Sequence, residues 1–197
     1  MDSKLKITIM LPTFNSEKSR QQYNKPTKSS FHLFHPTHKT TSIGPLARKD
    51  IKTNLETQLE NATLTSDQII FEQESDDQLG HYFPAKVIDA QSCHPANPLL
   101  NEEVFGPIAV CDSFDSLDRA IQKANQTPFG LGASVWSEST EIIAHCTANI
   151  ECGTIAINKN VHSNIAVPFG GRKKSGLGIE LGIEGAFSFT GFKAIHQ

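Results

Sequence analysis

The sequence predicts an α/β fold built on a parallel sheet, and three observations support this class. Short apolar runs at 105–111, 133–136 and 154–158 have the length of buried strands. Two segments between them, 117–124 and 139–150, carry apolar residues at helical spacing. The connections are short, so we expect right-handed crossovers and a parallel βαβαβ sheet. Ligands of such sheets bind beyond the carboxyl ends of the strands, here near Gly106 and after Ile157.

The helix and strands before residue 105 are predicted from the spacing of apolar residues. An amphipathic helix is predicted from Arg48 to Ala62, because apolar residues recur there at intervals of four, four and three. Residues 69–71 form a short strand candidate, 72–80 a polar loop and 82–88 a second extended segment.

Polar and glycine residues indicate where the later helices begin and end. Asp115 or Ser116 can cap the helix at 117–124 by accepting a hydrogen bond from a backbone N–H. Ser139 or Thr140 opens the following helix. Gly153 is expected to end that helix in the left-handed conformation.

Charge and composition place a boundary near Ser42. Residues 1–42 hold seven Lys or Arg against two acids and twelve Ser or Thr, whereas residues 43–197 hold eleven Lys or Arg against nineteen acids. The first segment offers little apolar surface to offset its ordering entropy, so we predict that it is mostly flexible and that order begins at Gly44-Pro45. A mitochondrial presequence is disfavoured because Arg20 is the only arginine among residues 1–42. An RNA-binding arm is disfavoured further, because the basic residues are scattered.

The four cysteines have no C-x-x-C spacing, which argues against a disulfide framework or a metal site. Reduced thiols fit a cytoplasmic protein, and no apolar run approaches the length of a membrane span or resembles a signal peptide. We predict structural roles for Cys93 in a loop, Cys111 at a strand end, Cys146 on an apolar helix face, and Cys152 near a helix end, where the dipole would raise its pKa. His145 and His162 are expected on the surface.

The run Glu102-Glu103-Val104-Phe105-Gly106-Pro107 is the first candidate for chemistry. Its carboxylate can accept two hydrogen bonds from a ribose diol while the aromatic ring packs against a nicotinamide face. The same residues also fit a solvated acidic pair followed by a buried phenylalanine.

The second candidate begins at Asn158 and continues with Pro168-Phe169-Gly170-Gly171 and the K-x-S-G-x-G-x-E pattern from Lys173 to Glu180. Its glycines permit positive φ and close backbone approach, which predicts a tight loop before a helix. Glu180 also fits a first-turn helix acid. A dinucleotide loop at 176–182 is rejected, because no strand precedes it and no acid follows about 20 residues on.

From about Ile43 to Gln197 the chain resembles the carboxyl-terminal part of the aldehyde dehydrogenase catalytic domain. The motifs that carry the resemblance, in the family's order, are Gly44-Pro45, Glu102 to Pro107, Ala124-Asn125 with Phe129-Gly130-Leu131, Glu151 to Thr154 with Asn158, and Pro168 to Glu180. The resemblance implies that Glu103 binds the nicotinamide ribose and Phe105 the nicotinamide of NAD or NADP. It also implies that Phe169 lines the substrate tunnel and that Glu180 lies near a water-mediated proton path. The closing Phe189 to Lys193 resembles a segment that contributes to subunit association.

The family oxidises aldehydes through a thiolate nucleophile, and the G-Q-x-C segment that holds it does not occur in these 197 residues. The E-L-G-G-K base motif, the oxyanion asparagine and the Rossmann half of the family are not found either. We therefore expect a truncated or frame-disrupted form that is inactive alone. The alternative is a non-catalytic interaction module that associates with itself or with an intact homologue. Neither a nucleic-acid nor a membrane partner is expected.

Overall fold

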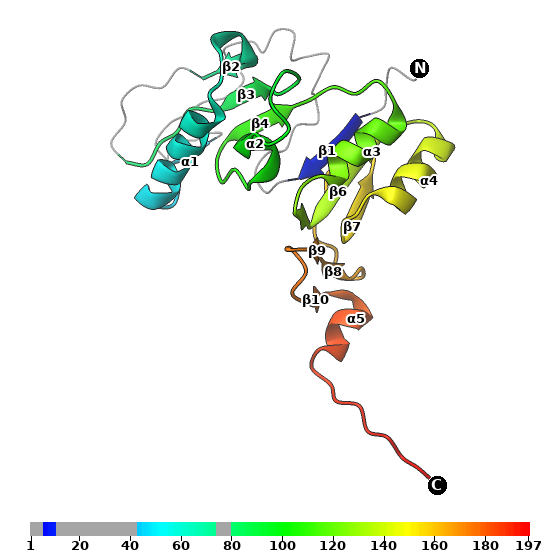
Figure 1. The fold of residues 1–197 in the computed structure, drawn as a ribbon. Helices are drawn as coiled ribbons and strands as arrows, with labels where there is room; N and C mark the ends of the chain where they lie inside the picture. The colour runs from blue at the N-terminus through cyan, green and yellow to red at the C-terminus, as the bar shows by residue number, and fades with distance from the viewer. Residues whose placement is uncertain (1–5, 11–42, 74–79) are drawn as a thin grey trace. The chain divides into compact units, whose positions relative to one another are not determined.

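The computed structural model describes residues 6–10, 43–73 and 80–197, with the backbone alone for residues 6–10. The chain divides into two compact units (Figure 1). We call the described residues between 43 and 113 the first unit, and residues 6–10 with 114–197 the second unit. Each unit has its own sheet and its own apolar core.

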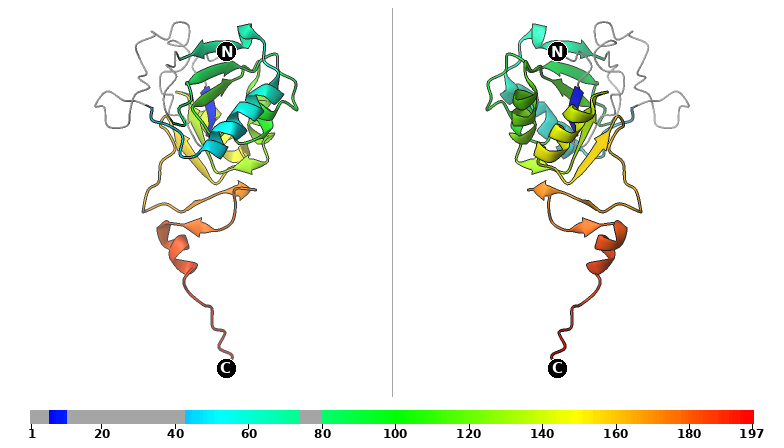
Figure 2. Two further views of the ribbon diagram at one scale, coloured as in Figure 1. Left: turned by 90° about the vertical axis from the view of Figure 1, so that its left-hand side faces the viewer. Right: turned by 90° about the vertical axis from the view of Figure 1, so that its right-hand side faces the viewer.

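The first unit is a three-stranded sheet in the order β2-β3-β4, covered by helices. Its elements are α1 (Lys49–Ala62), η1 (Ser66–Gln68), β2 (Ile69–Glu72), β3 (Lys86–Asp89), α2 (Pro98–Asn101) and β4 (Ile108–Cys111). The β2–β3 pair is antiparallel, and the β3–β4 pair is parallel. Apolar residues of α1 and α2 pack with those of β3 and β4. In Figure 2, α1 is the cyan helix that lies beside the strands of this sheet. The buried cluster consists of Leu55, Ala62, Phe83, Ile88, Leu99, Val104 and Ile108.

The second unit contains a three-stranded sheet in the order β1-β6-β7, with two helices packed against it. Its elements are β1 (Lys6–Met10), α3 (Leu117–Asn125), β5 (Phe129–Gly130), β6 (Gly132–Trp136), α4 (Thr140–Asn149), β7 (Thr154–Ile157), β8 (Phe169–Gly170), β9 (Arg172–Lys173), β10 (Ile179–Glu180) and α5 (Gly182–Phe187). Ala133 and Val135 of β6 share one face, as strand periodicity requires, and pack with Ile121 of α3 and Cys146 of α4. This packing fixes both helices on one side of the sheet.

Serine side chains cap both of these helices: of the two candidates that the sequence offered for each, Ser116 rather than Asp115 caps α3, and Ser139 rather than Thr140 caps α4. Ser116 accepts a hydrogen bond from the backbone N–H of Arg119, and Ser139 accepts one from Ile142. The prediction for Gly153 is wrong, since α4 ends at Asn149, its C-cap Ile150 has extended backbone, and Gly153 does not have positive φ. Glycine is required there for another reason: a Cβ on Gly153 would lie 2.6 Å from the carbonyl carbon of Gly170.

The predicted α/β class with parallel sheet elements is confirmed, and the pairing of one strand is corrected. The β6–α4–β7 connection joins parallel strands as expected. The strand expected at 105–111 is shorter, and as β4 it pairs with β3. It is not a neighbour of β6, because β1 and β7 occupy the two edges of β6.

Within residues 1–42 the structure describes one strand, β1, which was not predicted from the sequence. The remainder of that segment lies outside the described residues, so its flexibility stays a prediction. Among the helices that the structure describes, none has the length and apolar character needed to cross a membrane.

Candidate functional site

Helix α1 holds the Glu102–Pro107 motif by two contacts. The side-chain amide of Gln58 donates to a Glu102 carboxylate oxygen at 3.0 Å and to the Glu103 carbonyl at 3.1 Å. One turn earlier on the helix, Leu55 lies against Gly106 so closely that a Cβ there would meet the Leu55 Cγ at 3.3 Å. Because Leu55 is 1% exposed, it has little room to move. The motif is therefore attached to α1 at both of its ends.

This attachment presents Phe105 to the surface. Val104 is buried in the core of the first unit and Gly106 is buried against α1, whereas Phe105 between them is 50% exposed. The buried phenylalanine of the alternative interpretation is therefore not observed. Glu103 is half-buried, and within the described part of the chain no side chain bonds to its carboxylate. An exposed ring and an uncommitted carboxylate two residues apart are suited to a ligand with an apolar face and hydroxyl groups.

The loop from Pro168 to Glu180 folds back on itself in the second unit. Strand β8 pairs antiparallel with β10, and Phe169 lies directly opposite Glu180 in this register. Phe169 is half-buried and Glu180 is exposed. Glu180 precedes Leu181, the N-cap of α5, and the acid in the first turn of α5 is Glu184. The interpretation of Glu180 as a first-turn helix acid is therefore wrong, and its role in a proton path stays a prediction.

The expected loop before a helix is confirmed, but its glycines do not carry the positive φ. Among the glycines that the structure describes, only Gly80 and Gly182 have positive φ, and both lie outside the loop. Within and directly after the loop, Lys173 at φ 53° and Leu181 at φ 60° have this conformation. Gly171 and Gly176 instead allow close approach between backbone segments of the loop.

Lys173 anchors this loop to the rest of the second unit, a role that the sequence did not reveal. Its ammonium group donates to the carbonyl of Asn125 at 2.7 Å and to that of Thr127 at 3.1 Å, and lies 2.9 Å from the Glu151 carboxylate. Asn125 also links the ends of helices α3 and α4. Its side-chain NH2 group donates to the Asn149 carbonyl, and its side-chain oxygen accepts from the Glu151 N–H. Lys173 lies 48 residues after Asn125, so no local sequence pattern could have indicated this contact.

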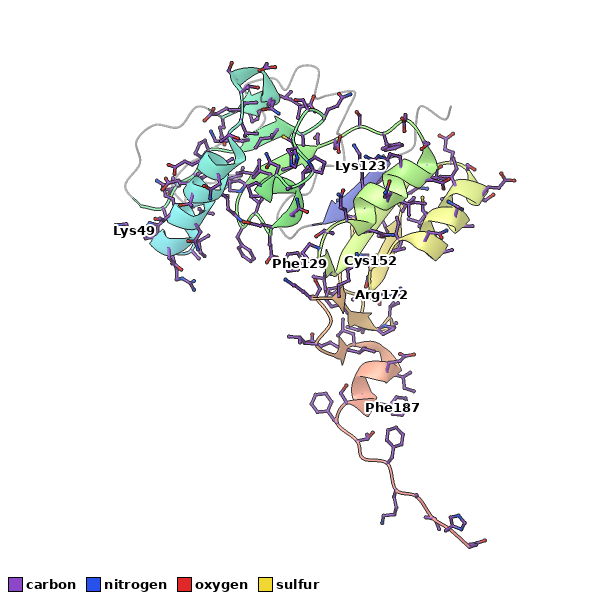
Figure 3. The ribbon with its side chains drawn as sticks, in the orientation of Figure 1. Lys49, Lys123, Phe129, Cys152, Arg172 and Phe187 are labelled. Carbon is purple, nitrogen blue, oxygen red and sulfur yellow. The ribbon has the colours of Figure 1, made fainter. Side chains whose placement is uncertain are left out.

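Two further contacts fix the neighbourhood of the loop. Asn158, just after β7, accepts from the Ser137 N–H and donates to the Ser137 carbonyl, both at 2.9 Å. This pair of hydrogen bonds joins the carboxyl ends of β6 and β7. Ligand-binding sites of parallel sheets lie at this end of the strands. At the amino ends, Phe129 of β5, Cys152 and Arg172 of β9 lie near one another (Figure 3).

The cysteines that α4 and β7 bring into the core are poorly suited to nucleophilic attack. Cys146 is fully buried on the apolar face of α4, as predicted, and burial raises the pKa of its thiol. The pKa of Cys152 is raised too, but the main cause is burial rather than the helix dipole that the sequence suggested. Cys93 and Cys111 are half-buried.

The two histidines behave differently from each other. His145 and His162 are exposed, as predicted. However, the His145 Nε2 lies 3.1 Å from the Asp118 carboxylate, a contact between α3 and α4 that sequence spacing did not suggest. Among the described residues, no group of three or more His, Cys, Asp or Glu side chains is placed to hold a metal ion.

Comparison with known proteins then decides the family. The sequence profile described as "Aldehyde dehydrogenase family" matches residues 15–195, and so begins within the segment that our sequence analysis left outside the resemblance. The chain belongs to the aldehyde dehydrogenase family. A probable succinate-semialdehyde dehydrogenase [NADP(+)] from Synechocystis sp. is 37% identical over 160 residues, which are 81% of this chain and 35% of that relative.

Solved aldehyde dehydrogenase structures have the same fold. The succinic semialdehyde dehydrogenase of Streptococcus pyogenes, solved with NADP+, matches with a TM-score of 0.74 and 30% identity, over 82% of this chain and 35% of that one. The betaine aldehyde dehydrogenase of Staphylococcus aureus, solved with NAD+, matches with a TM-score of 0.73 and 27% identity, over 82% of this chain and 32% of that one. The chain thus spans about a third of the length of these relatives.

The predicted site residues of this aldehyde dehydrogenase chain fall into two pairs. Glu103 and Phe105 lie together in the first unit, and Phe169 and Glu180 lie opposite each other in the second.

Proposed function

We propose that this chain forms one wall of the nicotinamide and substrate site of an NAD- or NADP-dependent aldehyde dehydrogenase. The exposed Phe105, held between buried Val104 and Gly106, is the observation that carries the proposal. Bound NAD(P) would supply the hydride acceptor, and the protein would supply position and electrostatics. Phe105 would present its ring to the nicotinamide, and Glu103 would accept hydrogen bonds from the ribose hydroxyls.

Phe169 and Glu180, the second pair of residues, would take part in binding and oxidation of the aldehyde. Phe169 would contribute apolar surface to the substrate tunnel, and Glu180 would exchange protons through water. The relatives named above act on semialdehydes or betaine aldehyde according to their names, which makes succinate semialdehyde the first substrate to test.

We also propose that this stretch of 197 residues does not turn over aldehydes by itself. Thiolate attack requires an accessible, electropositive cysteine. Cys146 and Cys152 are buried and have raised pKa values, and no cysteine of the sequence stands in a G-Q-x-C segment. The four free thiols support a reducing compartment, for which we propose the cytoplasm.

Two measurements test these statements separately. Purified chain mixed with NAD+ or NADP+ and succinate semialdehyde should form no reduced nicotinamide, and thiol-dependent formation would refute the claim of inactivity. Saturation-transfer NMR with nicotinamide mononucleotide should show contact that Phe105→Ala abolishes. Phe187→Ala is the matched control, because Phe187 is 54% exposed on α5. Equal losses in both variants, or no contact in the parent chain, would refute the cofactor wall.

A second candidate function is association without catalysis. Large apolar side chains are exposed throughout residues 165–195, including Leu177 at 99%, Phe189 at 94% and Phe192 at 97%. Large exposed apolar side chains gathered in one stretch of a chain are typical of an interaction surface. We propose as the alternative that this surface docks onto an intact homologue or a second copy, and sedimentation over a range of concentrations tests it. A monomer at every concentration, alone and with a homologue, would exclude this alternative.

A further inference from the structure

The edge of β6 is occupied by a strand from far away in the sequence. Residues Lys6–Met10 pair antiparallel with Gly132–Trp136 over five positions, without a register shift. Strand β6 is the middle strand of its sheet, and four of its five residues are buried. Helix α3 also lies close to β1, so that this strand extends the sheet beneath the helix.

Strand β1 is separate from the family part of the chain. The aldehyde dehydrogenase match begins at residue 15, whereas β6 lies inside it. A strand outside the match therefore covers the edge of a strand within the match. If β1 were absent, alternate N–H and C=O groups of β6 would face outward, and exposed edges of this kind pair readily with other strands.

The sequence of β1 suits this position. Residues 6–9, Lys-Ile-Thr-Ile, alternate polar and apolar side chains, and the strand as a whole is rich in β-branched residues and contains neither proline nor an acid. The same features would also let this segment pair with the β6 edge of another molecule.

We propose that the β6 edge is a docking site for an antiparallel strand, and that residues 6–10 of the same chain are its resident occupant. This occupancy prevents the edge from pairing with residues 6–10 of a second copy. Pairing of β1 with β6 of the same chain is favoured over pairing with β6 of a second copy, because the tethered strand has the higher effective concentration. Residues 11–131 tether β1 to β6 within one chain, and a tether that lets two sites meet gives an effective concentration that can approach mM, above the micromolar concentrations of ordinary protein solutions.

The first experiment uses two truncations, one removing residues 1–5 and the other residues 1–11. Only the second removes β1. A fluorescent peptide of residues 5–11 should bind the chain that lacks 1–11 and should not bind the chain that lacks 1–5, whose edge is already filled. A peptide with Thr8→Pro and Ile9→Pro is the control: adjacent residues of a strand point in opposite directions, so one of these prolines removes an N–H that faces β6. Equal binding to both truncations, or none to a folded chain lacking 1–11, would overturn the proposal.

The second experiment works in the intact chain and does not depend on a truncation that folds. With Cys93 and Cys111 replaced by serine, the pair Thr8→Cys and Ser134→Cys places two thiols directly opposite each other. Opposed residues of antiparallel strands have Cα atoms roughly 4.5–5.5 Å apart, within the range that a disulfide bridges. The control pair, Ile9→Cys with Ser134→Cys, puts the thiols on opposite faces of the sheet.

Non-reducing electrophoresis then separates the outcomes. Rapid cross-linking of the 8–134 pair within one chain, with the 9–134 pair remaining reduced, supports a resident strand. Cross-linked dimers at 8–134 would show that a second copy fills the edge. That result would overturn the proposal, as would the same slow cross-linking in both pairs.

Discussion

Replacing Lys173 should loosen the second unit, because this side chain uses all three of its ammonium hydrogens. Two go to the carbonyls of Asn125 and Thr127, and the third faces the Glu151 carboxylate. Lys173→Met keeps the length of the side chain and its apolar stem but removes every one of these bonds. The positive φ of residue 173 is present in both proteins, so its cost cancels in the comparison.

The size of the expected loss in the free energy of unfolding follows from how exposed each partner of Lys173 is. Glu151 is 55% exposed, so its ion pair is worth only about 0–1 kcal/mol. The carbonyl bonds matter more, because the Lys173 side chain is 23% exposed and Thr127 is buried. Hydrogen bonds to a charged group contribute roughly 1.5–3 kcal/mol. Since the two carbonyls share one donor group, we expect a total loss of about 2–3 kcal/mol.

Urea unfolding followed by the fluorescence of Trp136 measures this loss. Trp136 is the only tryptophan and lies on β6, in the same unit as Lys173. At a slope of about 1–2 kcal/mol per M, the midpoint should fall by roughly 1–2 M with the slope unchanged. Lys174→Met is the control: Lys174 is exposed, and its backbone N–H bonds to Pro128 whatever its side chain. If both variants shift the midpoint equally, the anchoring role of Lys173 is wrong.

Four further predictions rest on the contacts and the burial of single residues. Gly106→Ala should lower the stability of the first unit by about 1–3 kcal/mol through overlap with Leu55. Thermal unfolding followed by circular dichroism should show this, with Gly44→Ala, where no atom lies within 4 Å, nearly unchanged. Asn158→Ala should lose about 1–3 kcal/mol with its two bonds to Ser137. Asn158→Gly should lose less in the same urea assay, because glycine tolerates φ 52°. Cys146 and Cys152 should react with a thiol reagent more slowly than Cys93, and equal rates in the native chain would contradict their burial. Because their pKa values are raised in the folded state, stability should be constant below the ordinary thiol pKa of 9.0 and fall as pH rises above it.

Local patterns allowed α1, α3 and α4 to be predicted from the sequence. Helix α1 was expected from apolar spacing between Arg48 and Ala62, and it spans Lys49–Ala62. The serine caps of α3 and α4 were also anticipated. Each of these features depends on residues within one or two turns of one another, so a single stretch of sequence contains the whole cause.

Strand pairing and site support depend on residues that are distant in the sequence. Nothing near β4 indicates that it pairs with β3, or that β1 would take the edge of β6. Gln58 lies 45 residues before Glu103, and Lys173 lies 48 residues after Asn125. The motifs identified Glu103, Phe105 and Phe169 as candidates. The residues that hold the motifs in place became visible only through tertiary contacts.

Backbone strain in and directly after the loop from Pro168 to Glu180 shows why side-chain contacts must hold this loop in place. Lys173 and Leu181 have positive φ without being glycine or asparagine, and each such residue costs on the order of 1–3 kcal/mol. A strained backbone persists only where its surroundings fix it. For Lys173, the residue's own side chain provides the restraint through Asn125, Thr127 and Glu151. All of these groups belong to the second unit, so the unit contains the contacts that hold the Phe169 loop in its strained shape.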